Sequence, residues 1–597
     1  MKKHGRLHLI LRFSQQVRGY FLIVLLASFV STILNSLIPR IFSFTIDQVL
    51  VPGGISWLKE NLWMLSLVVI AIALVNGVAI YLYRSNTAKA GETFAKTLRD
   101  MLFYHVQRLP VKWHAQNQTG DIIQRCTADV ETIRNFVVTQ VLEVFRTVFL
   151  LVISLIMMFS MNVKLTFVAL AFTPVIVLYS GVFYHLIARN FTAADEAEGE
   201  LSTVVQENAT GVRVVRAFGR EKFEIDRFDE KNVIFARLWI RLGTLSGLYW
   251  AVGDLITGFQ VLFIITLGAV EAVHGGITAG EFIAFASYNT TLVWPVRSLG
   301  RILSDMSKAG VSFDRVNYIL DSEEEDMSLE GKKPLHMDIT FDHVTFGYED
   351  GQNILKDVSF HIKEGATYGI LGGTGSGKST LVHLLDRLFV LEKGRIQIGG
   401  VDIQDIPVGW LREHVGMVMQ EPFLFSRTIR ENIAAANPEA TMEEIREAAK
   451  IACVDEEILS FPDGYDTMVG ERGVTLSGGQ RQRVAIARML IAKAPIMVFD
   501  DSLSAVDAET DTRIRRVLKE KMKDATVILI SHRITTLMEA DRILVLNHGK
   551  EEESGTHREL IERDGIYRKI YEIQMNQDDR RLLEEGGEAD ERIRGRK

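Results

Sequence analysis

The sequence predicts two fused domains of different class, an all-α membrane domain of six helices and a following α/β domain. Three observations carry this prediction. Six apolar runs lie in the first half of the chain, a glycine-rich loop at Gly372–Thr380 joins an apolar segment to a helical pattern, and strand-like and helix-like segments alternate from Met337 onward. In a chain of 597 residues a single core is not expected. We place the membrane domain at 1–320, a charged linker at 321–336, the α/β domain at 337–577 and a charged tail at 578–597.

Composition excludes several classes of protein. The formal net charge of −8 gives no reason to expect nucleic-acid binding. The two cysteines, Cys126 and Cys453, fall in different predicted domains, so neither a disulfide framework nor a zinc site is supported. Hydrophobic residues make up 47% of the chain, which suits a membrane half joined to a polar half. The partner that composition indicates is therefore a lipid bilayer.

The predicted spans are apolar runs of bilayer-crossing length. They are Gly19–Pro39, Leu62–Tyr83, a run centred on Thr147–Val163, Leu165–Ala188, Leu242–Val270 and Phe282–Val296. The first run follows basic residues, is too long for a signal-peptide core and lacks a clear cleavage site, so we expect it to stay as an anchor.

Loop lengths and charges predict the orientation. The loops at 84–146 and 189–241 are long and polar and, with the N-terminus, hold most of the Lys and Arg residues of this half. By the positive-inside rule, both termini and the long loops are cytoplasmic. We expect the long loops to continue the membrane helices into the cytosol, with turns near Gln118–Gly120 and Gly211–Val214.

Polar and aromatic residues within the last two spans are candidates for a solute cavity. Asp254 is the one acidic residue well inside a predicted span, which makes it a functional candidate, although it can also face water or pair with an Arg. The other candidates are Tyr249, Trp250, Tyr288, Asn289, Thr291 and Trp294. Hydroxyl and aromatic groups facing one cavity would bind an amphipathic solute, but bonds between helices and interfacial aromatics explain each residue equally well.

The glycine-rich loop matches the phosphate-binding pattern G-x-x-x-x-G-K-[ST]. Its residues are Gly372, Gly373, Thr374, Gly375, Ser376, Gly377, Lys378, Ser379 and Thr380. Free N–H groups and the helix dipole at such a turn favour a phosphate. Lys378 would reach the β- and γ-phosphates, and the Ser379 hydroxyl would bind Mg²⁺.

Five single residues add to this signal. The Tyr348 ring would stack on adenine, unless it is an ordinary core tyrosine. Gln420 would contact Mg²⁺ or the attacking water. Asp500 ends an apolar strand, as a Mg²⁺-positioning carboxylate requires, and Asp501 follows it. His532 follows another apolar strand and would orient the γ-phosphate or the water.

A second candidate phosphate cradle opens a later helix. Its residues are Ser477, Gly478, Gly479 and Gln480, after Leu476. Because one loop already holds this chain's phosphates, the second cradle is expected to face nucleotide held by a partner subunit.

In this order the motifs resemble those of an ATP-binding cassette (ABC) exporter half-transporter, over nearly the whole chain. The matching elements are an A-loop at Tyr348, Walker A at Gly372–Ser379, a Q-loop at Gln420, a signature at Leu476–Gln480, Walker B at Asp500, a D-loop at Ser504–Asp507, a switch histidine at His532, an X-loop at Thr467–Gly473 and coupling regions at Thr119–Asp121 and Gly211–Glu221. The resemblance implies a type IV exporter membrane domain fused to a nucleotide-binding domain, in a bacterial plasma (inner) membrane. It also implies ATP and Mg²⁺ held between two subunits, and alternating access driven by ATP.

The chain departs from the family pattern at Asp501, where the pattern has Glu as general base. Losing one methylene withdraws the carboxylate by about 1.5 Å, one C–C bond, and a misplacement of that order can cost roughly 100-fold in rate. The sequence therefore predicts slow hydrolysis at this site. It resembles the degenerate-site subunit of heterodimeric bacterial multidrug exporters, whereas a homodimer that works with Asp is the alternative.

Efflux of drugs or other amphipathic solutes is the leading interpretation of this resemblance. Two alternatives stay open. One is a homodimeric flippase for lipids or lipid-linked glycans. The other is a membrane-bound nucleotide sensor that moves nothing itself.

Overall fold

A computed structural model describes residues 6–575 apart from 329, 349–350, 471–472, 474, 503–505, 507 and 522–523. The predicted tail and three of the four predicted D-loop residues, Ser504, Ala505 and Asp507, lie outside the described residues, as do two residues of the predicted X-loop. The chain divides into two compact units. One comprises Met1–Leu109 and Asn117–Glu323, and the other comprises Pro110–Gln116 and Glu324–Lys597.

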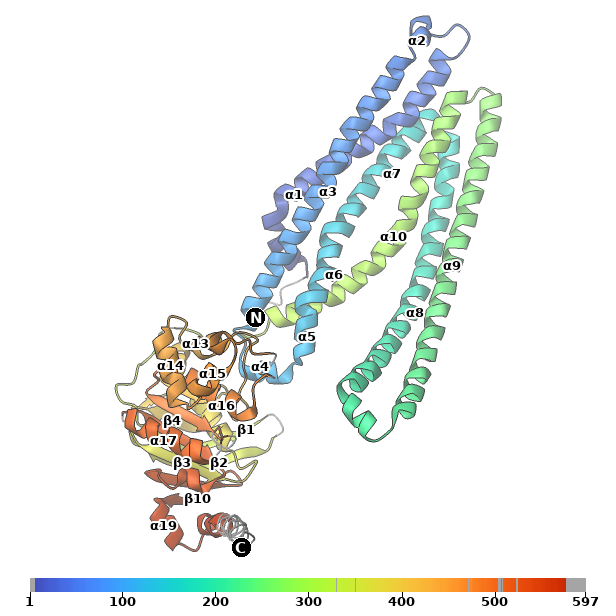
Figure 1. The fold of residues 1–597 in the computed structure, drawn as a ribbon. Coiled ribbons are helices and arrows are strands. Elements are labelled where there is room, and N and C mark those ends of the chain that lie inside the picture. Colours follow the sequence, from blue (N-terminus) through green and yellow to red (C-terminus); the bar gives the residue numbers. More distant parts are fainter. Residues whose placement is uncertain are drawn as a thin grey trace. The chain divides into compact units, whose positions relative to one another are not determined.

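The membrane unit is helical throughout its ordered elements (Figure 1). Its helices are α1 Arg6–Phe44, α2 Ser56–Glu60, α3 Trp63–Val106, α5 Thr119–Gln124, α6 Val130–Arg134, α7 Val141–Met161, α8 Val163–Ala217, α9 Glu221–Val273 and α10 Ala279–Leu320, with π-helical turns at Thr45–Val49, Arg125–Asp129 and Asn135–Gln140. α1 packs along α3, α8 along α9, and α10 contacts α1, α7, α8 and α9.

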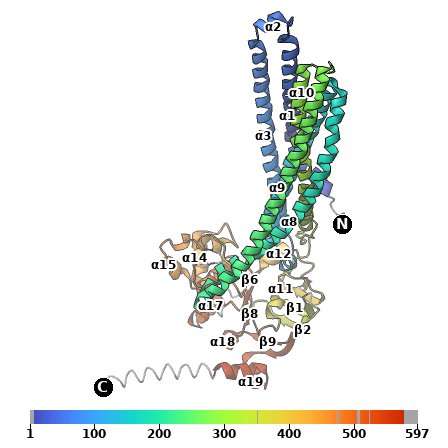
Figure 2. The same cartoon turned by 90° about the vertical axis from the view of Figure 1, so that its right-hand side faces the viewer.

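Helices α8 and α9 form a long antiparallel hairpin (Figures 1 and 2). At 55 residues α8 is about 80 Å long, whereas the hydrocarbon core of a bilayer is about 30 Å thick. The predicted long loop is therefore a continuation of two membrane helices. Its turn lies at Phe218–Arg220, between α8 and α9, and not near Gly211–Val214 as the sequence predicted.

Five stretches of helix within the described residues are long and apolar enough to cross a membrane. They are Gln16–Val49, Trp63–Val106, Thr119–Met161, Val163–Ala217 and Glu221–Val273. The sixth predicted span, Phe282–Val296, lies inside α10, where the polar run Ser287–Thr291 lowers the mean hydropathy. The third predicted span is shorter than expected at its C-terminal end, because α7 ends at Met161 and Val163 opens α8.

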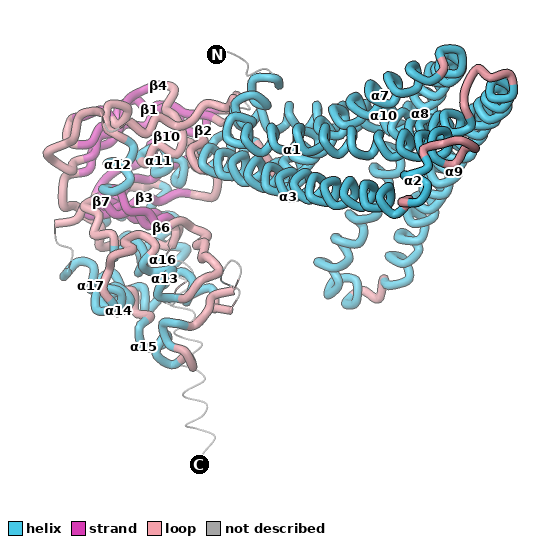
Figure 3. Tube along the Cα trace, turned by 90° about the horizontal axis from the view of Figure 1, so that it is seen from above, coloured by secondary structure: helices cyan, strands magenta, loops and turns pink. Residues whose placement is uncertain are grey.

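The described residues of the second unit form two sheets (Figure 3). The strands are β1 Ile339–Gly347, β2 Asn353–Ile362, β3 Thr367–Gly372, β4 Lys393–Ile398, β5 Val401–Asp402, β6 Val415–Val418, β7 Ile496–Asp500, β8 Thr526–Ser531, β9 Arg542–Asn547 and β10 Lys550–Gly555. An antiparallel sheet has the order β2-β1-β4-β5, and a six-stranded sheet has the order β10-β9-β3-β8-β7-β6. In the larger sheet β9, β3, β8, β7 and β6 are parallel.

Successive side chains of the central strands point to opposite faces of the larger sheet, and each face is covered by its own hydrophobic core. In β7, Phe499 belongs to the core with α16, while Val498 belongs to the core with α11 and the antiparallel sheet. Strands buried on both faces read as continuous apolar runs, which is why Ile496–Asp500 was predicted as a buried strand. The helices of this unit are α4 Val111–Gln116, α11 Lys378–Leu385, α12 Val408–His414, α13 Ile429–Ala434, α14 Met442–Ile451, α15 Asp455–Ser460, α16 Gly478–Ile491, α17 Ala508–Lys521, α18 Ile534–Leu537 and α19 His557–Glu562.

A half-buried carboxylate lies where the linker meets this unit's core. Asp386 follows α11, and its Oδ1 atom is buried without a hydrogen-bond partner. Burial raises the pKa of Asp386 to about 7, the nearby Arg412 opposes the rise, and Glu325 adds to it. Arg412 donates two hydrogen bonds of 2.8 and 2.9 Å to Glu325, a residue of the predicted linker.

We expect Asp386→Asn to remove a pH dependence of stability. Because the folded-state pKa is raised, stability from the protonated carboxyl is present at low pH and is lost as pH rises from about 4 to about 7. At pH 8 the Asp386→Asn chain should have a higher free energy of unfolding than the unchanged chain. A pKa shift from 3.8 to about 7 limits this difference to about 4 kcal/mol. Thermal unfolding of the purified full chain at pH 5.5 and 8 measures it, with the exposed Asp405→Asn as control. An unchanged pH dependence in Asp386→Asn would contradict the prediction.

Candidate functional site

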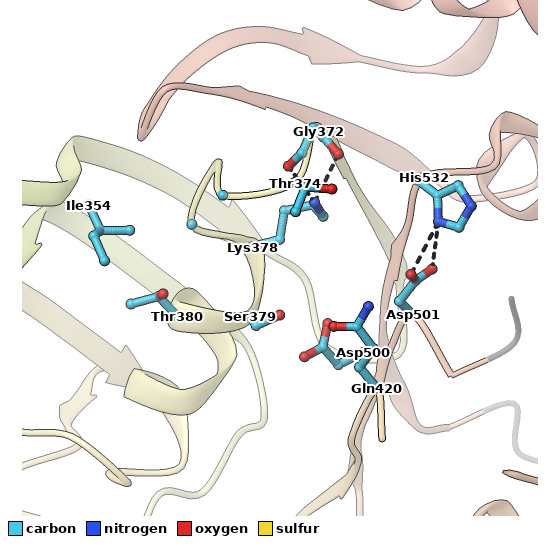
Figure 4. A pocket seen from close by; sticks show the side chains of 13 residues that line it. Ile354, Gly372, Thr374, Lys378, Ser379, Thr380, Gln420, Asp500, Asp501 and His532 are labelled. Carbon is cyan, nitrogen blue, oxygen red and sulfur yellow. Dashed lines mark hydrogen bonds and ion pairs between the residues drawn. The ribbon is translucent and has the colours of Figure 1, made fainter. Parts of the chain in front are cut away.

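A pocket of about 550 Å³ gathers most of the residues predicted for the nucleotide site, but not Tyr348, Ser376 or the second cradle (Figure 4). It is lined by Ile354, Gly372, Gly373, Thr374, Gly375, Gly377, Lys378, Ser379, Thr380, Gln420, Asp500, Asp501 and His532. Of these, Ile354 was not predicted from the sequence; as an apolar residue of β2 it carries no local signal of a site.

The sheet topology explains why these residues meet. The glycine-rich loop follows β3, His532 follows β8, Asp501 follows β7 and Gln420 lies two residues beyond β6. These four strands are neighbours and run parallel, so their carboxyl ends share one edge of the sheet. Ligands of α/β sheets bind at that edge.

Two glycines of the loop are required by the local backbone. Gly377 has a φ of +99° immediately before α11, and a Cβ there would lie 2.7 Å from the Leu355 side chain. A Cβ at Gly372 would lie 2.6 Å from Ser376 Oγ. The loop therefore brings bare backbone to the start of α11, where the free N–H groups of the first turn favour an anion.

Lys378 lies within this loop as its cationic group. Its Nζ atom donates to the carbonyl oxygens of Gly372 and Gly373, each at 2.8 Å. Burial lowers the pKa of Lys378, while Asp501 and Asp500 act in the opposite direction. A partly desolvated ammonium bonded to neutral carbonyls is well placed to bind phosphate oxygens.

Asp500 and Ser379 fit a divalent cation. The Asp500 side chain is buried, burial raises its pKa, and a hydrogen bond from Ser379 opposes that rise. A buried carboxylate with a raised pKa lacks enough positive charge around it. Hydroxyl and carboxylate oxygens together with the Gln420 amide, which also lines the pocket, are donors that suit Mg²⁺.

Asp501 and His532 form a contact pair at the mouth of the pocket. His532 Nδ1 lies 3.1 Å from each carboxylate oxygen of Asp501, as Figure 4 shows. Asp501 has a φ of +46°. That left-handed backbone conformation is uncommon outside glycine, although Asp adopts it more readily than most residues.

Tyr348 lies near the loop but does not line the pocket. Its ring is 40% exposed and meets Phe346 and Phe389 edge-on, with centroids 5.2 and 5.1 Å away. Its hydroxyl lies 3.5 Å from Thr380 Oγ1. A half-exposed ring held by two others offers a flat face beside the loop, and Phe389 is a neighbour that the sequence reasoning missed.

The second cradle does not line this pocket. Ser477 caps α16 through a reciprocal pair of bonds: its Oγ accepts from Gln480 N at 3.2 Å, and Gln480 Oε1 accepts from Ser477 N at 2.9 Å. Gln480 Nε2 donates to Glu457 at 3.1 Å, a contact that no local sequence signal indicated. Ser477 and Gly478 are exposed, so the Ser477 hydroxyl and the backbone at the start of α16 can meet a group outside this chain.

The solute-cavity candidates are placed differently from one another. Tyr288 and Asn289 are packed inside the unit: the Tyr288 hydroxyl donates to the Ser36 carbonyl, and Asn289 Oδ1 accepts from Gln260 at 2.8 Å. In this structure both residues bridge helices and do not face open space. By contrast Trp250, Asp254 and Thr291 are exposed, Tyr249 is half-buried among aromatic rings, and the Trp294 side chain lies outside the described residues.

Fold and site together define a class of protein, an ATPase of the P-loop type joined to a membrane-spanning helical domain. Family models agree with both halves. Residues 21–296 match the ABC transporter transmembrane region, and residues 355–504 match the ABC transporter model.

Relatives and solved structures of the same architecture cover nearly the whole chain. The chain is 36% identical over 561 residues to the uncharacterized ABC transporter ATP-binding protein YknU of Bacillus subtilis, covering 93% of this chain and 95% of that one. It is 34% identical to the putative multidrug export ATP-binding/permease protein YgaD of the same organism, over 94% and 99%. A bacterial Atm1-family ABC exporter with ATP bound matches with a TM-score of 0.82 and 26% identity, over 94% and 99%.

The chain therefore belongs to the ABC transporter family, as an exporter whose membrane and nucleotide-binding domains are fused. It is a multi-pass membrane protein and an ATP-hydrolysing transporter. The fold and the family predicted from the sequence are both confirmed.

Proposed function

We propose that this protein is one half of a heterodimeric exporter of drugs or other amphipathic solutes, and that its own Walker site hydrolyses ATP slowly. The observation that carries the slow site is the identity and placement of Asp501. Asp501 lines the phosphate pocket directly after Asp500. Its side chain is one methylene shorter than the Glu that the family pattern has at this position. Support for solute efflux comes from relatives whose names record putative multidrug export.

The polar residues that line the pocket divide the work of binding and hydrolysis in this proposal. The loop N–H groups and Lys378 would bind the β- and γ-phosphates, and Ser379, Gln420 and Asp500 would hold Mg²⁺, whose positive charge would be supplied next to the phosphates. Asp501 would act as general base on the attacking water, and His532 would fix the carboxylate and contact the γ-phosphate. The two 3.1 Å contacts between His532 Nδ1 and the Asp501 carboxylate support these roles for Asp501 and His532.

The slow site follows from reach. A general base must lie within hydrogen-bond distance of the water it deprotonates. With one methylene fewer than Glu, and with both carboxylate oxygens already facing His532 Nδ1, Asp501 approaches that water less closely. The retained His532 favours the alternative of a homodimer that still turns over, so turnover of the lone chain separates the two.

The exposed Ser477–Gly478 turn would complete a competent site on a second subunit that carries Glu. We place the nucleotide-binding half and the turn of the α8–α9 hairpin on the cytoplasmic side, because the polar segments that continue these helices are rich in Lys and Arg.

The decisive experiment compares the purified chain alone with the chain co-purified with a half-transporter that has Glu after its Walker B Asp. We expect slow ATP turnover from the lone chain, faster turnover from the pair, and ATP-dependent uptake of ethidium, an amphipathic cation, into inside-out vesicles by the pair. Brisk turnover from the lone chain would remove the heterodimer, and turnover without uptake of any amphipathic probe would favour a nucleotide sensor.

A further inference from the structure

The loop that carries His532 is held by a residue from the end of the described chain. Gln574 Nε2 donates to the His532 carbonyl oxygen at 2.8 Å. Gln574 Oε1 accepts from the Ile534 backbone N–H, also at 2.8 Å. One amide group therefore binds the loop on both sides of Arg533, with its donor on one side and its acceptor on the other.

This contact replaces a cap that the local sequence does not supply. α18 begins at Ile534, and its N-cap residue Arg533 makes no side-chain capping bond. The first N–H groups of a helix need partners from outside the helix. Gln574, 40 residues later than Ile534, takes one of them. Because the two ends of an amide differ, the paired bonds fix the loop's direction as well as its position.

The segment that delivers Gln574 is itself anchored. Residues 566–575 are helical. Tyr567 of this segment is fully buried, and its hydroxyl lies 2.6 Å from His557 Nδ1 of α19. Ile566 and Ile570 pack against the core that contains Phe499 of β7. The amide thus comes from a rigid support.

We propose that Gln574 is a positioning residue for the ATPase site, which holds the His532 loop so that the ring stays against Asp501. The role of the site rests on the proposed function, whereas the two bonds to the loop do not. His532 Nδ1 lies 3.1 Å from both Asp501 oxygens, while its side chain is 57% exposed. The backbone on either side of His532 is therefore where the ring's position is set.

The test uses two substitutions of Gln574 in the full chain. Gln574→Leu removes both bonds at similar size. Gln574→Glu keeps an acceptor for Ile534 N–H, but places a carboxylate against the His532 carbonyl. We expect kcat to fall about tenfold in Gln574→Leu, because a shift of order 1 Å in a catalytic group can cost up to 100-fold, and to fall by an intermediate amount in Gln574→Glu. KM for ATP should change less than twofold. Glu572→Gln, which breaks an exposed ion pair with Arg568 on the same segment, is the control and should change neither value.

A double substitution separates positioning from folding. If Gln574 acts through His532, then Gln574→Leu should have no further effect on kcat in a His532→Ala background. Equal effects of Gln574→Leu in both backgrounds, or a lower unfolding temperature with unchanged kcat, would overturn the inference. The series is measured on the chain with Asp501 or, where its turnover is slow, on Asp501→Glu. Brisk turnover with Asp501 would overturn the slow site and leave this test intact.

Discussion

Replacing Asp501 with Glu is expected to raise ATP turnover of the purified chain by about 10- to 100-fold. The added methylene advances the carboxylate by about 1.5 Å, and positioning errors of that size account for rate losses up to roughly 100-fold. The backbone limits the gain, since Asp501 has a φ of +46° and Glu tolerates the left-handed region less well than Asp. We therefore expect the thermal midpoint of Asp501→Glu to be somewhat lower even as turnover rises.

The matched control is Asp501→Asn, which keeps the side-chain length and removes the base. It should bind ATP as well as the unchanged chain does and show still lower turnover. Steady-state phosphate release measures the three chains, and equilibrium binding of a fluorescent ATP analogue shows that the pocket is intact. Equal turnover with Asp and Glu would mean that reach is not limiting, and the homodimer would then be the better interpretation.

The grouping of the Walker, Q-loop and switch residues in one pocket was predictable because they follow strands. A glycine-rich loop after an apolar strand, a carboxylate at the end of another and a histidine after a third all point to one sheet edge once the sheet is parallel. The pocket brings together Lys378, Gln420, Asp501 and His532 at that edge, although these residues are up to 154 positions apart in sequence, from 378 to 532. Local patterns indicate where each strand ends. The order of the parallel strands then places those ends side by side.

Contacts between distant polar groups were not predictable. Gln574 bonds to the His532 loop, and Glu457 accepts a hydrogen bond from Gln480. Both are common polar residue types in helical segments that carry no motif. Their roles depend on which helices pack together, and no spacing in the sequence records that. Pairing of this kind has to be read from the structure.

One prediction in the membrane half is wrong, and its cause is physical. Glycine marks turns in soluble proteins, so the sequence predicts a turn near Gly211–Val214, yet Gly211 lies within α8, and the turn is at Gly219 with a φ of +58°. For Tyr288 and Asn289 the sequence leaves a solute cavity and bonds between helices equally open, and in a low-dielectric interior polar side chains bond to neighbouring helices. Here Tyr288 bonds to the first helix and Asn289 to Gln260.

Replacing Lys378 with Ala is expected to weaken ATP binding at this site by about 10- to 100-fold, since hydrogen bonds to charged groups contribute about 1.5–3 kcal/mol each. The Nζ atom also donates to two carbonyl oxygens of its own loop at 2.8 Å. The substitution therefore removes these two bonds within the loop as well as the contact with the phosphates. Without the ammonium, the loop keeps its glycines but loses the positive charge to which the Gly372 and Gly373 carbonyl oxygens are bonded. Lys393→Ala, an exposed lysine on β4, is the matched control and should bind ATP normally.

The same substitution distinguishes a transporter from a sensor when it is placed in the subunit pair. If ATP at this site closes the two nucleotide-binding halves on each other, ethidium uptake by vesicles containing the pair, measured with ATP below the Kd of this site, should fall at least about tenfold, in proportion to the lost occupancy. The partner's site keeps its own Walker residues, so residual turnover without uptake is the expected signature of uncoupling. Uptake that is unchanged by Lys378→Ala, despite weakened ATP binding, would mean that occupancy of this pocket regulates the pair without driving it.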